Sequence, residues 1–283
     1  MKLLRYGQPG RERAGVLDRD GRVRDLSALH SDIRAESLSP EVLDRLRGID
    51  PASLPLVDAA ERIGPCVSGV SKVVCIGLNY RDHANETGKP IPTEPVVFMK
   101  ATTSISGPND DVVLPRDAEK GDWEVELGIV IGRKAQYVAE EDWLSHVAGF
   151  CVVNDVSERA FQVERGGQWV KGKSSDTFCP LGPWLVTPDE VPDPQALELV
   201  AEVSGEIMQE GSTSDMIFSC AEIVSYVSRF MTLLPGDVIA TGTPAGVGFA
   251  RNRFLKPGDS MRLSVSGLGE QYQRVVAYED SAR

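Results

Sequence analysis

The sequence of 283 residues lacks long apolar runs and an excess of positive charge. No stretch of about 18 apolar residues occurs, so no membrane-spanning helix is predicted. The net charge of −12 argues against binding to nucleic acid or to an anionic membrane. The first residues, Met1-Lys2-Leu3-Leu4-Arg5-Tyr6, lack the apolar core of a secretory signal, and we expect a cytoplasmic protein.

Cysteine and histidine are also scarce. The five cysteines, Cys66, Cys75, Cys151, Cys179 and Cys220, are odd in number and form no Cys-x-x-Cys pair. This pattern argues against a disulfide framework and against a zinc ribbon, so reduced thiols are expected. The chain has only three histidines, and the plain surroundings of His30 and His146 are typical of structural histidines.

The pattern of short apolar stretches predicts a β-rich α+β fold in two parts. Residues 1–69 form a small N-terminal α+β domain and linker, with a hairpin turn at Asp20-Gly21 and a helix begun by Ser39-Pro40. Residues 70–283 hold many short strands and few helices, without alternating βα units. The clearest helix is predicted for residues 220–233, which follow a capping box.

Two glutamates at alternate positions of one predicted strand are the first candidate site. Glu124 and Glu126 leave an extended strand on the same face, and neighbouring carboxylates repel unless a cation lies between them. Asp155, after the next predicted strand, supplies a third carboxylate. Oxygen ligands suit Mg²⁺ or Mn²⁺, or Ca²⁺, better than zinc. The alternative at this stage is a solvated strand face.

Two polar side chains follow Asp155 at helical spacing. If this segment is a helix, Arg159 and Gln162 are neighbours on one of its faces. Arg159 could neutralise the acids or hold a substrate carboxylate. A surface salt bridge is the alternative for Arg159.

His83 and Glu86 lie three residues apart between a predicted strand and a flexible loop. A carboxylate at this spacing can orient an imidazole and support it as a general base. The loop of residues 88–92 contains glycine and proline, and it could act as a lid that excludes water. A structural histidine is the alternative.

Two glycine-containing segments remain. Gly167–Ser174 matches the nucleotide-binding pattern G-x-x-x-x-G-K-S, but the following Ser175–Pro183 cannot form the required helix. A nucleotide loop is therefore rejected, and Lys173 stays of interest as a cation near a metal-bound anion. In Ala240–Gly248 a strand runs into a turn whose amides and hydroxyls could hold a carboxylate, although a tight structural turn explains it equally well.

Five segments together resemble the fumarylacetoacetate hydrolase family, and they occur in the family's order between residues 70 and 280. They are Gly77–Glu86, Trp123–Gly128, Asn154–Arg159, Gly172–Ser174 and Thr241–Gly248. The resemblance implies a mixed β-sandwich roll, a Mg²⁺ or Mn²⁺ centre and a homodimer. The chain is similar to the shorter branch of the family, in which the acid of the dyad follows the histidine by three residues.

The resemblance also implies residue roles. It assigns the metal ligands to Glu124, Glu126 and Asp155. It assigns catalytic roles to His83, Glu86, Lys173 and Gln162. It assigns substrate binding to Arg159, Thr243, Lys100 and Tyr80.

Within the family, Gln168–Phe178 and Gly182–Thr187 are most similar to hydrolases of 2,4-diketo-3-deoxy sugar acids of the rhamnonate and fuconate type. We therefore expect a metal-dependent hydrolase that cleaves a carbon–carbon bond in a 2,4-dioxo acid and releases pyruvate. The alternatives are an isomerase or decarboxylase of a related 2-hydroxydienoate or oxo acid, and a ureidoglycolate lyase. A protein that binds a metal and an oxo acid without turnover is the alternative outside the enzymes.

Overall fold

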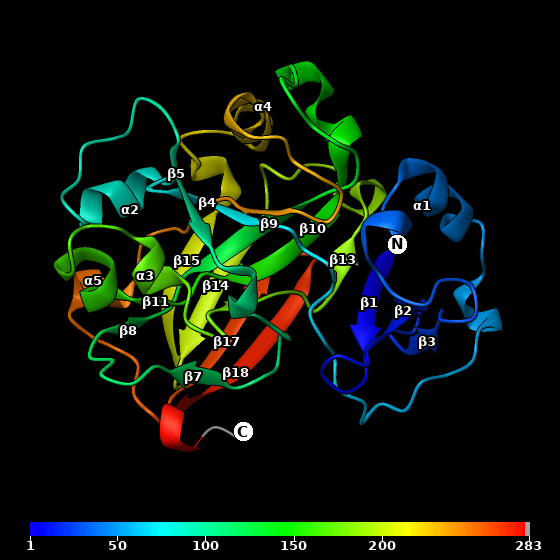
Figure 1. The fold of residues 1–283 in the computed structure, drawn as a ribbon, viewed down its shortest axis with the longest axis horizontal. Coiled ribbons are helices and arrows are strands. Elements are labelled where there is room, and N and C mark those ends of the chain that lie inside the picture. Colours follow the sequence, from blue (N-terminus) through cyan, green and yellow to red (C-terminus); the bar gives the residue numbers. More distant parts are fainter. Residues whose placement is uncertain (281–283) are drawn as a thin grey trace.

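Two β-sheets face each other across the main hydrophobic core in the computed structural model, which describes residues 1–280 (Figure 1). The larger sheet has the strand order β3-β2-β1-β13-β10-β9-β16-β4-β5. The smaller sheet has the order β15-β14-β17-β18-β7, and two short strand pairs, β8-β11 and β6-β12, lie outside both. The expected strand-rich fold of mixed α and β structure is confirmed.

The strands are short apart from those at the centre of each sheet. The larger sheet consists of β1 (Lys2–Tyr6), β2 (Arg13–Leu17), β3 (Val23–Asp25), β4 (Val73–Gly77), β5 (Val96–Lys100), β9 (Val125–Ile131), β10 (Val147–Asn154), β13 (Leu185–Val186) and β16 (Val238–Ala240). The smaller sheet consists of β7 (Val112–Leu114), β14 (Glu198–Val203), β15 (Glu206–Ser212), β17 (Ser260–Val265) and β18 (Gly269–Ala277). The short pairs are formed by β6 (Ile105–Ser106), β8 (Gly121–Asp122), β11 (Ser157–Glu158) and β12 (Cys179–Pro180).

The helices are few, as expected. They are α1 (Pro40–Arg47), α2 (Arg81–Glu86), α3 (Val170–Lys173), α4 (Cys220–Phe230) and α5 (Gly248–Arg251), with a π-turn at Ala160–Glu164 and several 3₁₀ turns. The predicted capping box of α4 is present: the Ser219 hydroxyl accepts from the Glu222 N–H, and the Glu222 carboxylate accepts from the Ser219 N–H. Among residues 1–280 no helix is long and apolar enough to cross a membrane.

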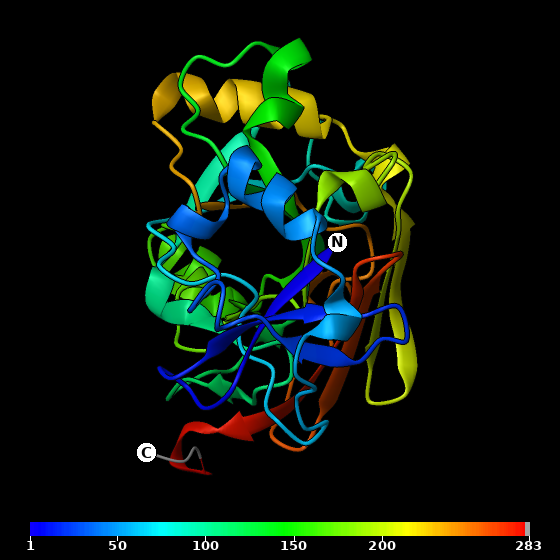
Figure 2. The same ribbon diagram turned by 90° about the vertical axis from the view of Figure 1, so that its right-hand side faces the viewer.

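Strand β9 lies in the middle of the molecule and is buried along its whole length. Its alternation sends Leu127, Ile129 and Ile131 into the core shared with the smaller sheet, and sends Val130 into a second core on the other side. Helix α4 and the 3₁₀ turn Glu140–His146 pack together above the sheets (Figure 2). The same period of two places Glu124 and Glu126 on one side of the strand.

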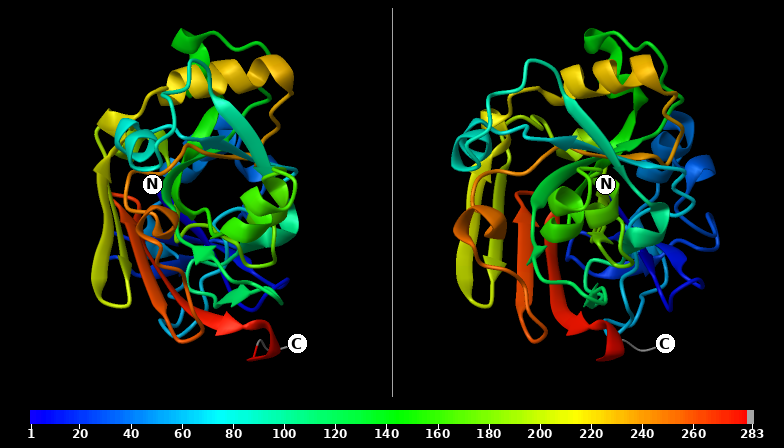
Figure 3. Two further views of the ribbon diagram at one scale, coloured as in Figure 1. Left: turned by 90° about the vertical axis from the view of Figure 1, so that its left-hand side faces the viewer. Right: turned by 60° about the vertical axis from the view of Figure 1, so that its left-hand side comes forward.

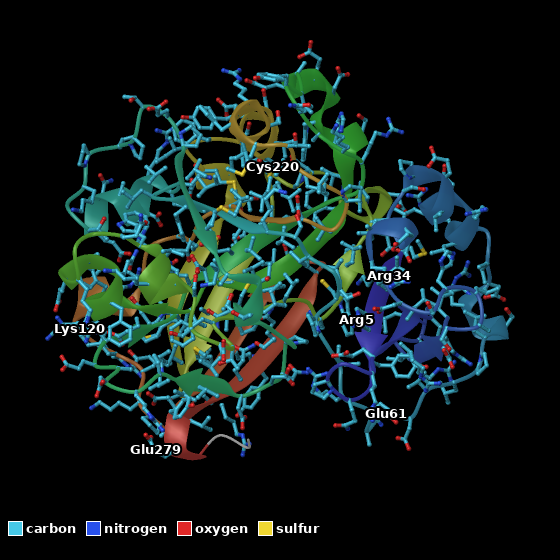
Figure 4. All side chains as sticks on the ribbon, in the orientation of Figure 1. Arg5, Arg34, Glu61, Lys120, Cys220 and Glu279 are labelled. Atoms are coloured by element: carbon cyan, nitrogen blue, oxygen red, sulfur yellow. The ribbon has the colours of Figure 1, made fainter. Side chains whose placement is uncertain are left out.

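The N-terminal strands continue the larger sheet. Strand β1 pairs with β13, with Leu3 opposite Leu185, and the predicted hairpin of β2 and β3 is present. Arg5, Arg34 and Glu61 mark this part of the molecule, at the opposite side from Lys120 (Figure 4). The boundary at residue 69 stays a prediction.

Candidate active site

The pairing of β9 with β10 brings the three acids together. In this antiparallel pair Val153 lies opposite Glu126, and the Asp155 N–H donates to the Glu124 carbonyl at 2.9 Å. Residues opposite each other at this spacing project on the same face. One carboxylate oxygen from each of Glu124, Glu126 and Asp155 lies within 4.8 Å of the others, and all three residues are buried.

Two buried lysines neutralise part of this negative charge. Lys173 Nζ lies 2.7 Å from Glu124 Oε2 and 2.7 Å from Asp155 Oδ2. Lys100 Nζ lies 2.5 Å from Asp155 Oδ1 and 3.0 Å from the Val156 carbonyl oxygen. Burying an unpaired charge costs free energy, and these ion pairs explain why the acids and the lysines can be buried together.

Arg159 holds a third position beside the acids and is also buried. Its Nε donates to Asp122 Oδ2 at 2.8 Å, one Nη donates to Glu124 Oε1 at 2.6 Å, and the other donates to Gln162 Oε1 at 3.0 Å. Arg159 and Gln162 are therefore neighbours, as predicted, although Gln162 lies in a π-turn. The surface salt bridge considered for Arg159 is wrong.

The pKa values of the two glutamates of the cluster shift in opposite directions. Burial raises the pKa of Glu126, and the charges of Asp155 and Glu124 raise it further. Burial also raises the pKa of Glu124, but Lys173 and Arg159 outweigh that effect and hold it well below its usual range. Within residues 1–280, Glu126 is thus the carboxyl of the cluster that has no lysine or arginine bonded to it.

The cluster fits a hard divalent cation. Glu124, Glu126 and Asp155 offer oxygen ligands within 4.8 Å of one another, and no cysteine or histidine belongs to the group. A divalent ion would supply the charge that Glu126 lacks, while the Gly242 N–H, 2.8 Å from Glu126 Oε2, fixes the carboxylate in place. The solvated strand face is excluded because the acids are buried.

Helix α2 carries the histidine–glutamate pair. His83 Nδ1 lies 2.8 Å from Glu86 Oε1, and Glu86 Oε2 accepts from the Gly246 N–H at 2.9 Å. A carboxylate at Nδ1 favours the tautomer with its proton there, which leaves Nε2 as a proton acceptor. Within residues 1–280 no protein group bonds Nε2, and His83 lines the pocket described below.

The turn after β16 connects these parts through its backbone. Its glycines at 242 and 246 have φ values of 100° and 109°, a region that favours glycine. Its amides donate to the chain's own carboxylates: Gly242 to Glu126, Ala245 to Asp82, Gly246 to Glu86, and Gly248 to Asp122. The carboxylate-binding turn considered from the sequence thus holds protein carboxylates. Helices α2 and α5 lie close together around it (Figures 1 and 3).

One pocket opens onto the cluster and the histidine, with about 640 Å³ of space including its mouth. Its lining includes seven of the residues predicted from the sequence, namely His83, Glu124, Glu126, Arg159, Gln162, Lys173 and Thr243. These residues come from five separate segments of the chain, so the fold assembles them.

Two residues predicted to bind substrate lie elsewhere. Lys100 is fully buried and holds Asp155, outside the pocket lining. Tyr80 packs in the main core, and its hydroxyl is buried without a hydrogen-bond partner. Thr243 lines the pocket, but its hydroxyl already donates to the Val125 carbonyl and accepts from Gln209 Nε2, each at 2.8 Å.

Asp122 and Gln209 are supporting residues that the sequence did not single out. Asp122 is fully buried and accepts from Arg159, Gly248 and the Phe249 N–H. Gln209 joins Thr243 to the Val125 N–H. Asp122 lies two residues before Glu124 in the same polar stretch, and this position is the only feature of the sequence that could have indicated its role. No feature of the sequence indicates the role of Gln209.

The segment that matches a nucleotide-binding loop has another structural reason. The Lys173 ammonium points into the acid cluster. A Cβ on Gly172 would lie 2.4 Å from the Glu158 carbonyl oxygen, so the glycine allows α3 to approach the chain closely. The rejection of a nucleotide loop is consistent with this geometry.

Known proteins resemble the chain over almost its whole length. Residues 72–276 match the model of the fumarylacetoacetate hydrolase C-terminal domain. A Burkholderia cenocepacia protein, whose name says only that it is a hydrolase, is 59% identical over 276 residues, 96% of this chain and 98% of its own.

Solved structures agree with the sequence relatives. The fumarylacetoacetate hydrolase of Exiguobacterium antarcticum has a TM-score of 0.83 at 37% identity, covering 98% of this chain and 99% of its own. Maleylpyruvate hydrolase of Sphingobium sp. SYK-6, solved with manganese(II) and pyruvate, has a TM-score of 0.82 at 31% identity with the same coverage. A 2-hydroxyhepta-2,4-diene-1,7-dioate isomerase of Mycobacterium marinum has a TM-score of 0.75 at 34% identity, again covering 98% and 99%. The chain belongs to the fumarylacetoacetate hydrolase family.

Proposed function

We propose that this protein hydrolyses the C3–C4 bond of a 2,4-dioxo acid and releases pyruvate and a second carboxylic acid. The observation that carries the proposal is that one pocket is lined both by Glu124 and Glu126 of the three-carboxylate cluster and by a histidine with a free Nε2. The cluster suits the binding of a 2-oxo acid through a metal, and the histidine suits the activation of water.

The histidine–glutamate pair supplies the base. Glu86, fixed by the Gly246 N–H, holds His83 with Nε2 free toward the pocket. His83 takes a proton from water, and the resulting hydroxide attacks the C4 carbonyl carbon. The C3–C4 bond then breaks, C3 is protonated, and pyruvate and the acid R–COO⁻ leave, so that one water is consumed in each turnover.

Two nearby groups can stabilise the negative charge that develops on the C4 oxygen. An ammonium has three N–H donors, and Lys173 uses two of them in hydrogen bonds to Glu124 and Asp155. Gln162 accepts from Arg159, and its own amide N–H groups donate no hydrogen bond within residues 1–280. Either residue could therefore donate to the oxyanion.

Glu124, Glu126 and Asp155 would hold the divalent metal, with Mg²⁺ as the proposed ion and Mn²⁺ or Ca²⁺ as alternatives. When bound, the ion would supply Lewis acidity to the carboxylate and 2-oxo oxygens of the substrate. The cation Arg159 lies at the same end of the pocket, where it balances the charge of Glu124.

A screen of 2,4-dioxo acids with Mg²⁺ or Mn²⁺ tests the proposal, with pyruvate and the second acid identified by NMR. The wild-type protein should release both products, and the His83→Gln variant should lose about 10²- to 10⁴-fold in turnover while it still binds metal. The absence of pyruvate release from every acid in the panel would refute the function.

An isomerase of a 2-hydroxydienoate is the second candidate, because one structural neighbour is an isomerase of that kind. Isomerisation needs the acid cluster but no attack by water, so its product keeps every carbon of the substrate. The same NMR screen separates the two reactions. The sugar-acid substrate expected from the sequence is one member of the panel. The polarity of the pocket lining affects how well such a substrate would bind.

A further inference from the structure

The pocket that Glu124 and Glu126 line is otherwise largely apolar in its lining. Six of its residues form an apolar wall: Leu78, Phe98, Val163, Trp169, Val247 and Phe249. Outside the acid cluster and its bonded partners, the polar lining residues are His83, Thr87, Lys89 and Thr243, and Lys89 is exposed. Hydroxyl groups on a bound substrate would therefore meet few partners on this wall.

Several polar groups next to the wall are already bonded within the protein, and the free donors of Lys173 and Gln162 are the ones that the proposed reaction uses at the C4 oxygen. Arg159 donates to Asp122, Glu124 and Gln162, and Lys173 donates to two acids of the cluster. The Thr243 hydroxyl already donates its hydrogen bond to the Val125 carbonyl oxygen. A polyhydroxylated chain that entered this pocket would exchange water for apolar side chains, which carries a free-energy cost for each unpaired hydroxyl.

The aromatic part of the wall is held in a fixed position. The rings of Trp169 and Phe98 meet edge to face, with their centroids 5.3 Å apart. Trp169 also lies against the backbone at Gly77, where a Cβ would come within 2.7 Å of the indole ring. The glycine thus leaves the space into which this aromatic ring fits.

Leu78 joins the wall at a conformational cost. Its φ is 55°, in the left-handed region that glycine and asparagine adopt far more readily than leucine. The next residue holds the backbone there: Asn79 donates to the carbonyls of Thr241 and Phe218 and accepts from the Phe218 N–H. Because strained backbone is frequent at functional sites, Leu78 is a candidate for a role of its own in this pocket.

We propose that Leu78, with Trp169 and its apolar neighbours, selects substrates whose group beyond C4 is a hydrocarbon chain and discriminates against a sugar-like chain. The inference rests on the proposed hydrolysis of 2,4-dioxo acids, and it names the substrate class within that reaction. Leu78 and Trp169 are then specificity-determining residues, distinct from the groups that activate water.

The test compares two acids of equal chain length, 2,4-dioxohexanoate and 5,6-dihydroxy-2,4-dioxohexanoate. We expect kcat/KM to be at least about tenfold higher for the first acid, because each hydroxyl buried without a partner weakens binding. Equal or better turnover of the dihydroxy acid would overturn this inference and leave the proposed function intact. If neither acid released pyruvate, this inference would fall, and the full panel of 2,4-dioxo acids would decide whether the proposed function falls with it.

Two variants test whether the apolar wall causes the preference for the hydrocarbon chain. Leu78→Asn relieves the backbone strain and places a polar group in the pocket, so the ratio of the two kcat/KM values should fall by about threefold or more without loss of thermal stability. Val163→Thr keeps the shape of a half-exposed residue and should lower the ratio in the same direction, which provides a second test if Leu78→Asn folds poorly.

The matched control is Tyr137→Asn. Tyr137 has a similar φ of 52° but is 73% exposed and lies outside this pocket. The control should leave the ratio unchanged. An unchanged ratio in both Leu78→Asn and Val163→Thr would contradict the role of the wall.

Discussion

Glu124 and Glu126 are the same amino acid two positions apart, and their neighbours make them different. Lys173 and Arg159 bond both oxygens of Glu124 and keep it ionised. Glu126 is fixed by a backbone amide, and burial and the neighbouring acids raise its pKa. Glu126 has no cationic side chain bonded to it, so we expect its carboxylate to respond most strongly to a bound metal ion.

This difference predicts that metal affinity depends on pH. Because the pKa of Glu126 is raised, protons compete with the metal for this carboxyl, so affinity should fall as pH is lowered and binding should release a proton. Titration calorimetry of Mn²⁺ in two buffers of different ionisation enthalpy measures both effects. Glu126→Gln should weaken binding by at least about tenfold and abolish the proton release, because one ligand charge is lost.

The control for that experiment is Glu210→Gln, which removes the same charge from an exposed position. It should leave affinity and proton release unchanged. Wild-type affinity that did not change with pH, or Glu126→Gln that bound as tightly as the wild type, would contradict the ligand assignment.

Asp122 gives a second prediction for a single residue. Its carboxylate accepts from Arg159 and from two amides of the α5 turn. Asp122→Asn cannot accept from all of these donors with one amide oxygen, so the free energy of unfolding should fall by about 1.5–3 kcal/mol, measured by urea denaturation. Turnover should fall as well, since Arg159 loses the partner that orients it.

Asp142→Asn, at an exposed site, is the matched control and should change neither quantity. A fully active and equally stable Asp122→Asn protein would show that Arg159 does not depend on Asp122.

The sequence predicts residues of this site better than it predicts their supports. Glu124, Glu126, Asp155, His83 and Lys173 stand in recognisable motifs, and the structure brings all five together. Gln209 is one polar residue in an edge strand, and its role depends on a turn 34 residues away in the chain. Spacing cannot reveal a contact that only the tertiary fold creates.

At the scale of elements, the turn between β16 and α5 organises the site. It holds one acid of the metal cluster, the acid of the dyad and the anchor of Arg159 through backbone amides. Its composition alone allowed a simple structural turn as well. The helix α4 and the N-terminal hairpin were predictable because capping and turn signals are local in the sequence.

This turn yields a prediction about glycine. A Cβ on Gly246 would lie 1.9 Å from the Met208 carbonyl oxygen, so Gly246→Ala must displace the turn and the amide that holds Glu86. We expect a large loss of turnover together with a lower melting temperature, measured by steady-state kinetics and thermal denaturation.

Gly258→Ala separates displacement from backbone strain. Gly258 has a comparable φ of 99°, but a Cβ there meets nothing within 4 Å. It should cost about 1–2 kcal/mol in stability and keep wild-type turnover. If the two variants lost activity equally, the amide of Gly246 would not have the positioning role assigned to it.

At the scale of the whole molecule, the sheet crosses the boundary predicted at residue 69. Leu3 and Leu43 of the N-terminal part share a core with Val130 and Ala148. Local sequence signals marked a linker, but they could not show that β1 pairs with β13, which lies in the second half of the chain. Homodimer formation and a cytoplasmic location stay predictions.

A chain that begins at residue 70 should therefore fail to fold. Each large aliphatic side chain uncovered costs about 1.5–3 kcal/mol, and several together match the whole stability of a typical domain. Near-ultraviolet circular dichroism and size-exclusion chromatography would detect the loss of packing. A compact, active product would show instead that residues 1–69 are an independent appendage.

The central claim is that the histidine and the acid cluster together direct water onto a 2,4-dioxo acid. Its most direct measurement is turnover in ¹⁸O-labelled water with Mg²⁺ or Mn²⁺, followed by mass spectrometry of the acid released alongside pyruvate. We predict one solvent oxygen in the new carboxylate of that acid, and loss of the reaction in His83→Gln and after chelation of the metal. A product that retains all carbons of the substrate and contains no solvent oxygen in a new carboxylate would contradict hydrolysis.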